Sequence, residues 1–156
     1  MTDAVAEVER AMIAIRRSQQ RRALSRIAKE RGRGGHDPVH ELLDVVEELA
    51  ERGEAGTVTA LSAAMGVDQP RASRLVARAV EQGLLRREAD QHDGRRAVLV
   101  PTEAGQAHLD ELHTFRRAVF AEVMADWPAD DRENFGRLLA AFVRGYGELG
   151  RRALPE

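Results

Sequence analysis

Three arginines are spaced so that one helix would carry them all on a single exposed face. Arg74 and Arg78 follow Arg71 by three and seven residues, so at about 100° per residue the three lie within an arc of roughly 60°. A planar guanidinium can donate two hydrogen bonds to guanine or pair with a phosphate. Gln69 and Ser73 lie near the start of the same segment and can also reach base edges or phosphates. These residue types predict contact with a polyanion, above all with DNA.

The other side of this segment is apolar, which predicts a helix over about residues 68–83 that packs on a core. Its apolar positions recur at helical spacing: Ala72, Leu75, Val76, Ala79 and Val80. Asp68 is expected to cap the first turn, Pro70 suits that turn, and Gly83 suits the C-terminal end. An isolated helix with an arginine face is more often an ordinary solvated helix, so the neighbouring elements decide between the two interpretations.

A short helix and a glycine turn precede the arginine segment. Residues 57–65 carry apolar side chains at helical spacing, and Gly66 can take the positive φ of a sharp corner. Leu61 and Met65 would contact the second helix, and Ser62 is small where the two helices approach each other. Two helices joined by a glycine-containing turn are typical of a helix-turn-helix.

A hairpin is predicted directly after it. Leu84–Asp90 and Arg96–Val100 alternate with the period of two that is typical of strands, and His92-Asp93-Gly94 is expected to turn the chain. A helix-turn-helix followed by such a hairpin is a winged helix-turn-helix. This arrangement places one helix in the major groove of DNA and a loop in the minor groove.

Arginine also stands at the tip of this wing, residues 91–96. Arg95 and Arg96 would lie near the minor groove, where A·T-rich sequence strengthens the negative potential that attracts arginine. Asp93 is interpreted as a local partner that holds Arg95 in place, because phosphates repel a nearby carboxylate. The candidate DNA-binding residues are Gln69, Arg71, Ser73, Arg74, Arg78, Arg95 and Arg96, with Asp93 orienting the wing.

The outer segments are predicted to be helices. Residues 3–31 form a long helical stretch whose middle, Arg16–Arg22, is too polar for a core. That middle could cross a neighbouring subunit, approach DNA phosphates or lie in water, and an interface or solvated position is favoured. Val39–Arg52 is expected to form an amphipathic helix that packs behind the helix-turn-helix. Thr102 is expected to cap a long helix that ends near Ala125.

The last predicted helix, which starts at Pro128, has a wide apolar stripe. Its members are Phe135, Leu138, Leu139, Phe142, Val143, Tyr146 and Leu149. So wide a stripe on a terminal helix indicates a partner, and we expect it to pack against the N-terminal helix of a second subunit. A two-fold dimer would present two recognition helices about one helical turn apart, so its DNA target would be an inverted repeat.

These motifs resemble those of the MarR family of bacterial winged-helix regulators. The matching pieces are Leu61-Ser62 through Gly66-Val67, Ser73-Arg74-Leu75-Val76, Gly83-Leu84-Leu85 and Asp93-Gly-Arg95-Arg96 through Thr102-Glu-Ala-Gly105. The wing motif, an Asp with Arg two residues later and Thr nine residues later, is the part that distinguishes this family from other helix-turn-helix proteins. The resemblance implies a homodimer joined through the N- and C-terminal helices. It also implies a small-molecule cleft between that helical layer and the DNA-binding lobes.

The expected fold is mainly α with a small two- or three-stranded β-wing. Residues 1–35 would be the N-terminal dimerisation helix, 36–101 the DNA-binding lobe and 102–156 the C-terminal dimerisation helices, all in one compact unit. The expected function is that of a sequence-specific transcriptional regulator, a repressor, which a small-molecule effector releases from its operator. The alternative is a winged-helix module for protein–protein contact. The arginine face argues against it, because a protein-docking face more often exposes Leu, Tyr or Trp.

Composition limits the other classes. The net charge is −2, but residues 71–87 contain five Arg against Glu81 alone, so the basic charge is local. The chain has no cysteine, which excludes disulfides and thiol-based oxidant sensing. The longest uncharged run, Ala55–Val67, is too short to span a bilayer, and no secretion signal is recognisable. We therefore expect a bacterial cytoplasmic protein, nucleoid-associated when bound, with no membrane partner.

An enzyme and a metal sensor are the remaining alternatives. The sequence has no nucleophile elbow, no phosphate-binding glycine loop and no zinc-protease His-Glu spacing, so catalysis is not expected. Five histidines could in principle bind a metal ion: His36, His40, His92, His108 and His113. Because they form no motif with ligand spacing and no thiolate accompanies them, neither a metal nor another cofactor is expected.

Overall fold

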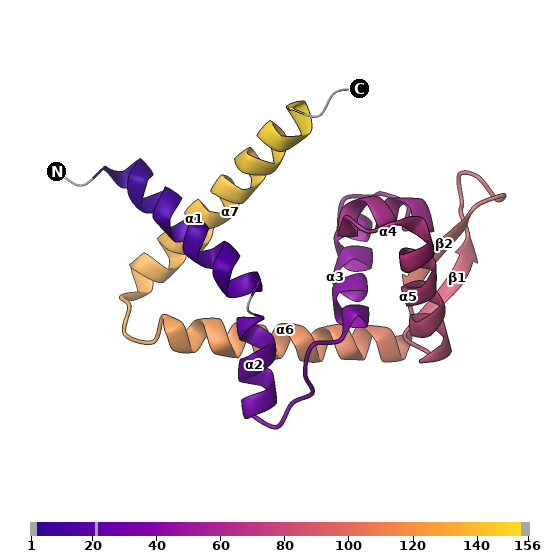
Figure 1. Cartoon of the computed structure of the whole chain (residues 1–156), viewed down its shortest axis with the longest axis horizontal. Coiled ribbons are helices and arrows are strands. Elements are labelled where there is room, and N and C mark those ends of the chain that lie inside the picture. Colours follow the sequence, from indigo (N-terminus) through magenta and orange to yellow (C-terminus); the bar gives the residue numbers. More distant parts are fainter. Residues whose placement is uncertain (1–2, 21, 154–156) are drawn as a thin grey trace. The chain divides into compact units, whose positions relative to one another are not determined.

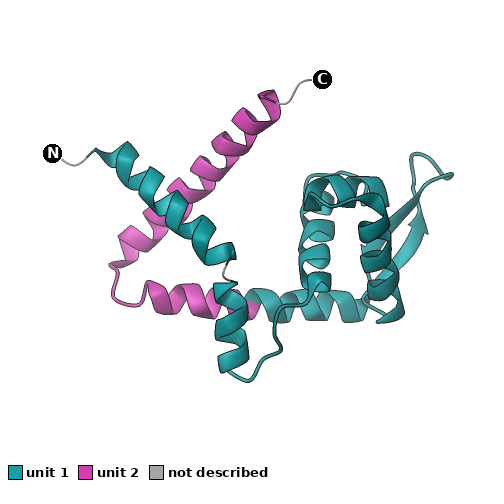
Figure 2. Cartoon of the chain, in the orientation of Figure 1, with its two compact units in different colours: residues 1–113 teal, residues 114–156 magenta. Residues whose placement is uncertain are grey.

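The computed structural model describes residues 3–20 and 22–153. They belong to two compact units, which divide between residues 113 and 114 within one long helix (Figure 2). The described residues are mostly helical, with one β-hairpin (Figure 1). The elements are α1 (Ala4–Gln20), α2 (Ala23–Glu30), α3 (Pro38–Glu51), α4 (Val58–Met65), α5 (Gln69–Glu81), β1 (Leu85–Ala89), β2 (Ala97–Pro101), α6 (Glu103–Val123) and α7 (Ala129–Arg152). This is the predicted winged helix-turn-helix order. None of the helices in the described ranges is both long enough and apolar enough to cross a membrane.

A single hydrophobic core holds the winged-helix lobe together. The helices α3, α4 and α5 contact one another, α5 also contacts β1, and α3 contacts β2 (Figure 1). The core residues are Val39, Leu42, Leu43, Val46, Leu49, Leu61, Val76, Ala79, Leu85, Leu99 and Leu109. Burial of each large side chain contributes about 1.5–3 kcal/mol. Since Leu109 belongs to α6, the start of that helix is anchored in the same core as α5.

The N-terminal stretch is broken rather than continuous, which corrects the prediction of one long helix over residues 3–31. The break separates α1 from α2, and Arg22 beside it has φ 52° and ψ 49°, the left-handed conformation. It falls within the polar run Arg16–Arg22, which offers no apolar stripe to hold a helix on a core. A left-handed residue cannot continue a right-handed helix. Arg21, which belongs to this run, lies outside the described residues.

The wing is a two-stranded antiparallel hairpin. Leu85 is paired with Pro101 and Ala89 with Ala97. The backbone N–H of Leu99 also donates to the Gly56 carbonyl at 2.9 Å, which ties the hairpin to the segment before α4. The turn lies one residue later than predicted: the Arg96 N–H donates to the Asp93 carbonyl at 3.0 Å. Gly94 and Arg95 are therefore its central residues, and Asp93 takes the first position, which aspartate favours in common turns.

The second unit consists of the end of α6 and the helix α7. Pro128 precedes α7, as predicted from the sequence. The apolar stripe of this helix is exposed along its length, at Phe135, Leu138, Leu139, Phe142, Val143, Tyr146 and Leu149. Trp127 and Phe135 pack edge to face with ring centroids 5.3 Å apart. Seven large apolar side chains in water on one helix form the kind of patch that marks an interaction surface.

Candidate nucleic-acid interface

The turn between α4 and α5 is fixed by hydrogen bonds at each of its ends. Asp68 caps α5 by accepting from the Arg71 N–H at 2.7 Å, as predicted. Gly66 has φ 64° and ends α4, also as predicted. Ser62 is buried, and its hydroxyl donates to the Val67 carbonyl at 2.7 Å. The sequence predicted only a small side chain at Ser62 and not this bond, which ties α4 to the turn that follows it.

The two faces of α5 differ in the way that its sequence predicts. Ala72, Val76 and Ala79 are completely buried, whereas Arg71, Ser73 and Arg74 are exposed. Leu75 and Val80 are partly buried and pack against the core. The guanidinium groups of Arg71 and Arg74 have no hydrogen-bond or ion-pair partner among residues 3–20 and 22–153. They are therefore available to an external anion.

Two other candidates on α5 are already engaged within the protein. The Arg78 guanidinium lies 2.9 Å from a carboxylate oxygen of Asp37. The Gln69 side-chain amide donates to the Thr59 hydroxyl at 3.1 Å, which links α5 to α4. The sequence interpretation assigned Arg78 and Gln69 to DNA alone. A cap at Asp37 could have been read from Asp followed by Pro38, but its pairing with Arg78 joins residues too far apart in the chain for any local pattern.

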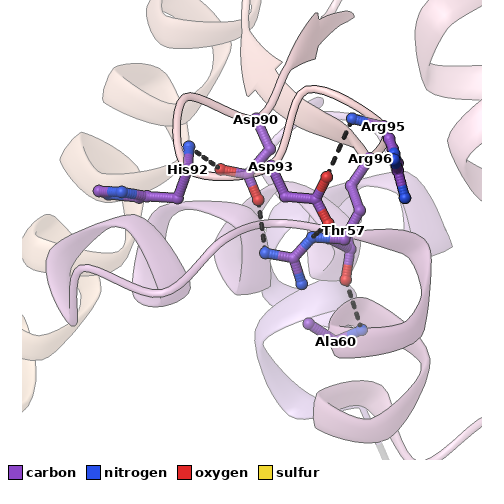
Figure 3. Close-up of polar contacts among 7 residues, drawn as sticks. All are labelled: Thr57, Ala60, Asp90, His92, Asp93, Arg95 and Arg96. Atoms are coloured by element: carbon purple, nitrogen blue, oxygen red, sulfur yellow. Dashed lines mark hydrogen bonds and ion pairs between the residues drawn. The ribbon is translucent and has the colours of Figure 1, made fainter.

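Asp90 fastens the base of the wing, although the sequence interpretation did not single it out. Its carboxylate accepts from the His92 N–H at 3.0 Å and from the Arg96 guanidinium at 2.5 Å (Figure 3). The side chain is 5% exposed. The hydrogen bond from the His92 backbone, followed by the bond from Arg96, lowers the pKa of Asp90 although burial opposes this shift. Arg96 is thus held by a buried carboxylate.

Arg95 lies at the tip of the wing, next to Asp93. Asp93 accepts from the backbone N–H of Arg95 at 3.1 Å, and its other oxygen lies 3.8 Å from Nε of Arg96 (Figure 3). Asp93 therefore contacts the backbone of Arg95 and pairs with the neighbouring guanidinium. Within the described part of the chain the Arg95 guanidinium makes no ion pair, so it is the tip cation available for contact.

A compact clasp connects the wing to the helices on both sides. The Thr102 hydroxyl donates to the Gly83 carbonyl at 2.5 Å and accepts from the Gly105 N–H at 3.0 Å. The Thr102 N–H also donates to the Leu84 carbonyl at 3.1 Å. A Cβ atom on Gly105 would lie 1.9 Å from the Leu84 carbonyl oxygen. The end of α5, the end of the hairpin and the start of α6 are therefore held in one fixed geometry.

The histidines of α3 and α6 contact one another or a carboxylate. The rings of His40 and His108 lie 4.8 Å apart, and His113 contacts Glu47 at 2.7 Å. No group of three or more potential ligands among the described residues is arranged to hold a metal ion. The candidate nucleic-acid interface is therefore built from arginines, helix caps and the contacts around Thr102.

Comparison with known proteins agrees with this geometry. The sequence model of the MarR family matches residues 43–96. A MarR family protein from Bacillus stearothermophilus has a similar fold, with a TM-score of 0.71 at 23% identity, over 94% of this chain and 99% of that one. Wild-type MarR from E. coli in its apo form gives 0.59 at 19% identity, over 85% and 94% of the two chains.

A third solved structure is BpsR from Bordetella bronchiseptica, whose DNA binding is regulated by 6-hydroxynicotinic acid. It gives a TM-score of 0.53 at 18% identity and covers 83% of this chain and 90% of that one. No curated protein sequence matches significantly. The family match covers α4, α5 and most of the wing, and the fold similarity extends over most of the chain. The winged-helix lobe thus matches the MarR family model over residues 43–96, and the fold over most of the chain is similar to that of solved MarR family proteins.

Proposed function

We propose that the protein is a transcriptional repressor that binds an inverted-repeat operator as a homodimer. The observation that carries this proposal is the exposed face of α5, on which Arg71 and Arg74 have no partner among the described residues. The opposite side of the helix is apolar and packs on the core. A helix held in this way can lie in the major groove without losing its place in the core. Ser73 lies on the exposed part of the same helix and can reach a phosphate or a base edge.

The wing supplies the second contact in this proposal. Arg95 would enter the minor groove, with the backbone of its turn held by Asp93. Arg96 would lie near the phosphates while it remains bound to Asp90. Gln69 and Arg78 would contribute chiefly by holding α5 in position, through Thr59 and Asp37 respectively.

The exposed stripe of α7 supports the homodimer. One winged-helix lobe makes too few base contacts for useful specificity, whereas two lobes related by a two-fold axis contact two half-sites. We propose that residues 1–35 and 102–156 form the dimer interface and residues 36–101 the DNA-binding lobe. The stripe from Phe135 to Leu149 would then be buried against the N-terminal helix of a second subunit.

We further propose that a small anionic or aromatic effector binds the dimer and changes the spacing between its two winged-helix lobes. The support is the fold similarity to BpsR, whose DNA binding responds to 6-hydroxynicotinic acid. A thermal-shift screen of phenolic acids and metabolites tests this part. Stabilisation by a compound that also weakens DNA binding supports an effector, and no response across a broad panel favours a constitutive regulator.

The main experiment is a fluorescence-polarisation titration with an operator selected from random duplex DNA. Arg74→Ala should lower the specific affinity by about 1–3 kcal/mol if this arginine reads a base. Arg144→Ala is the matched control, because by helical spacing Arg144 lies on the side of α7 opposite the apolar stripe. Arg95→Ala should weaken binding most at A·T-rich flanks.

The same titration separates the alternative function. A protein–protein module would bind no duplex, and Arg74→Ala would then have no effect on DNA affinity. A specific complex whose affinity falls steeply with salt supports the repressor. Equal loss of affinity for Arg74→Ala and Arg144→Ala would contradict the assignment of α5 as the reading helix.

A further inference from the structure

We infer that Asp37 is a positioning residue that withholds Arg78 from the DNA backbone and so lowers non-specific binding. This inference rests on the proposed function and names a specificity determinant for it. Arg78 belongs to the same arginine face as Arg71 and Arg74, but it is the member of that face with an internal carboxylate partner. The consequence is a reading helix that presents fewer free cations than its sequence contains.

The geometry of Asp37 allows it to do two things at once. One carboxylate oxygen accepts from the Val39 N–H at 3.0 Å and caps α3. The other oxygen lies 2.9 Å from the Arg78 guanidinium. Because the cap fixes Asp37 at the N-terminus of α3, where the helix dipole favours negative charge, the carboxylate stays beside Arg78 without help from a flexible side chain.

Arg78 would otherwise be placed to contact DNA. It lies about 40° around the helix from Arg74 and roughly 6 Å further along its axis. A phosphate that approached Arg78 would also approach Asp37 and be repelled by it. The pair therefore presents almost no net charge to the backbone. Its two side chains are 48% and 28% exposed, so solvent and salt reach the pair and the effect can be measured in solution.

The expected functional effect is on the ratio between the affinity for the operator and the affinity for random DNA. Non-specific binding arises from phosphate contacts and the release of their counterions, whereas base contacts set specific binding. Withholding one arginine per subunit removes a phosphate contact and leaves Arg71 and Arg74 free to read bases. Asp37 thus favours the operator over random DNA. Asp37 is the last residue of the link between α2 and α3, so the residue that would set this preference lies outside α5.

The test uses short duplex DNA of random sequence and the full-length protein. Asp37→Asn removes the charge and keeps the cap, because Asn and Asp are about equally good N-cap residues. Arg78 is then free, so the plot of log affinity against log salt should become steeper by about 0.9 per subunit. Over roughly 50 to 200 mM salt, this adds about a threefold loss of affinity per subunit. Binding to random DNA at the lowest salt should be tighter than for the wild type.

Two further variants make the test specific. Arg78→Ala, introduced into the Asp37→Asn background, should abolish the increase, because the guanidinium that Asp37→Asn frees is then absent. Glu81→Gln, on the same helix, removes one negative charge from a residue without an ion-pair partner among those that the structure describes. This control should change the slope less than Asp37→Asn does. Unchanged melting temperatures show that a slope change does not come from unfolding.

The outcomes separate the inference from the proposed function. A wild-type protein that binds no duplex at any salt concentration overturns the proposed function itself. A wild-type protein that binds, together with an Asp37→Asn slope equal to its own, overturns the inference alone. A slope that stays steeper in the Asp37→Asn/Arg78→Ala double variant, or that Glu81→Gln raises as much as Asp37→Asn does, overturns it as well.

Discussion

Replacing Gly105 by alanine should destabilise the winged-helix lobe, because the space for a side chain is already filled by backbone. The added Cβ would lie 1.9 Å from the Leu84 carbonyl oxygen and 2.9 Å from its carbonyl carbon. Ordinary contact starts near 3.4 Å, so the hairpin and α6 must separate by about 1.5 Å. That movement strains the core and stretches the hydrogen bond between Thr102 and Gly83. Overpacking costs about 1–3 kcal/mol, and a weakened hydrogen bond about 1 kcal/mol more.

Urea or thermal unfolding measures this cost directly. A loss of this size lowers the melting temperature by roughly 2–4 °C per kcal/mol in a chain of this length. Gly145→Ala is the matched control, because Gly145 also lies in a helix but a Cβ there meets nothing within 4 Å. The control should gain up to about 1 kcal/mol from helix propensity. If Gly105→Ala were as stable as this control, the clasp around Thr102 would not have the geometry described.

Three further changes test other parts of the structure. Ser62→Ala should cost about 1 kcal/mol in chemical unfolding, since the Val67 carbonyl loses its buried donor; an unchanged midpoint would contradict that role. The lowered pKa of Asp90 means that its stabilisation is complete above the ordinary value of 3.8 and is lost as pH falls through the lower folded value. The melting-temperature difference between wild type and Asp90→Asn should therefore be constant near neutral pH and shrink in acid. A difference that persists in acid would be evidence against the stabilising role of the contacts of Asp90 with His92 and Arg96. Leu138→Glu should convert a dimer to a monomer in sedimentation equilibrium, whereas Arg144→Ala should not; a variant that stayed dimeric would exclude the α7 stripe from the interface.

The features that the sequence predicted correctly depend on near neighbours. The cap at Asp68, the positive φ of Gly66 and the two faces of α5 each follow from a few adjacent residues. Helical periodicity and turn chemistry act over one or two turns, so they can be read without the rest of the chain. The turn of the wing was misplaced by one residue, because Asp-Gly indicates a turn but leaves its register open.

The features that the sequence could not give depend on residues far apart in the chain. Arg78 pairs with Asp37 across 41 residues, and no local pattern indicates which carboxylate an exposed arginine will meet. Gly105 is part of the motif that resembles the MarR family. Glycine is required there because the carbonyl of Leu84, at the start of the hairpin, fills the space of a side chain. The break near Arg22 was foreshadowed by the polar run, which indicates a weak point in a helix but not whether it breaks.

Hydroxyl-radical footprinting of the selected operator tests the central claim most directly. If two copies of α5 lie in successive major grooves, the protein should protect two patches on one face of the duplex. Their centres should lie about 10 base pairs apart, and Arg74→Ala should remove both patches at concentrations where the wild type protects them. A single protected patch, or two patches on opposite faces of the duplex, would contradict the account.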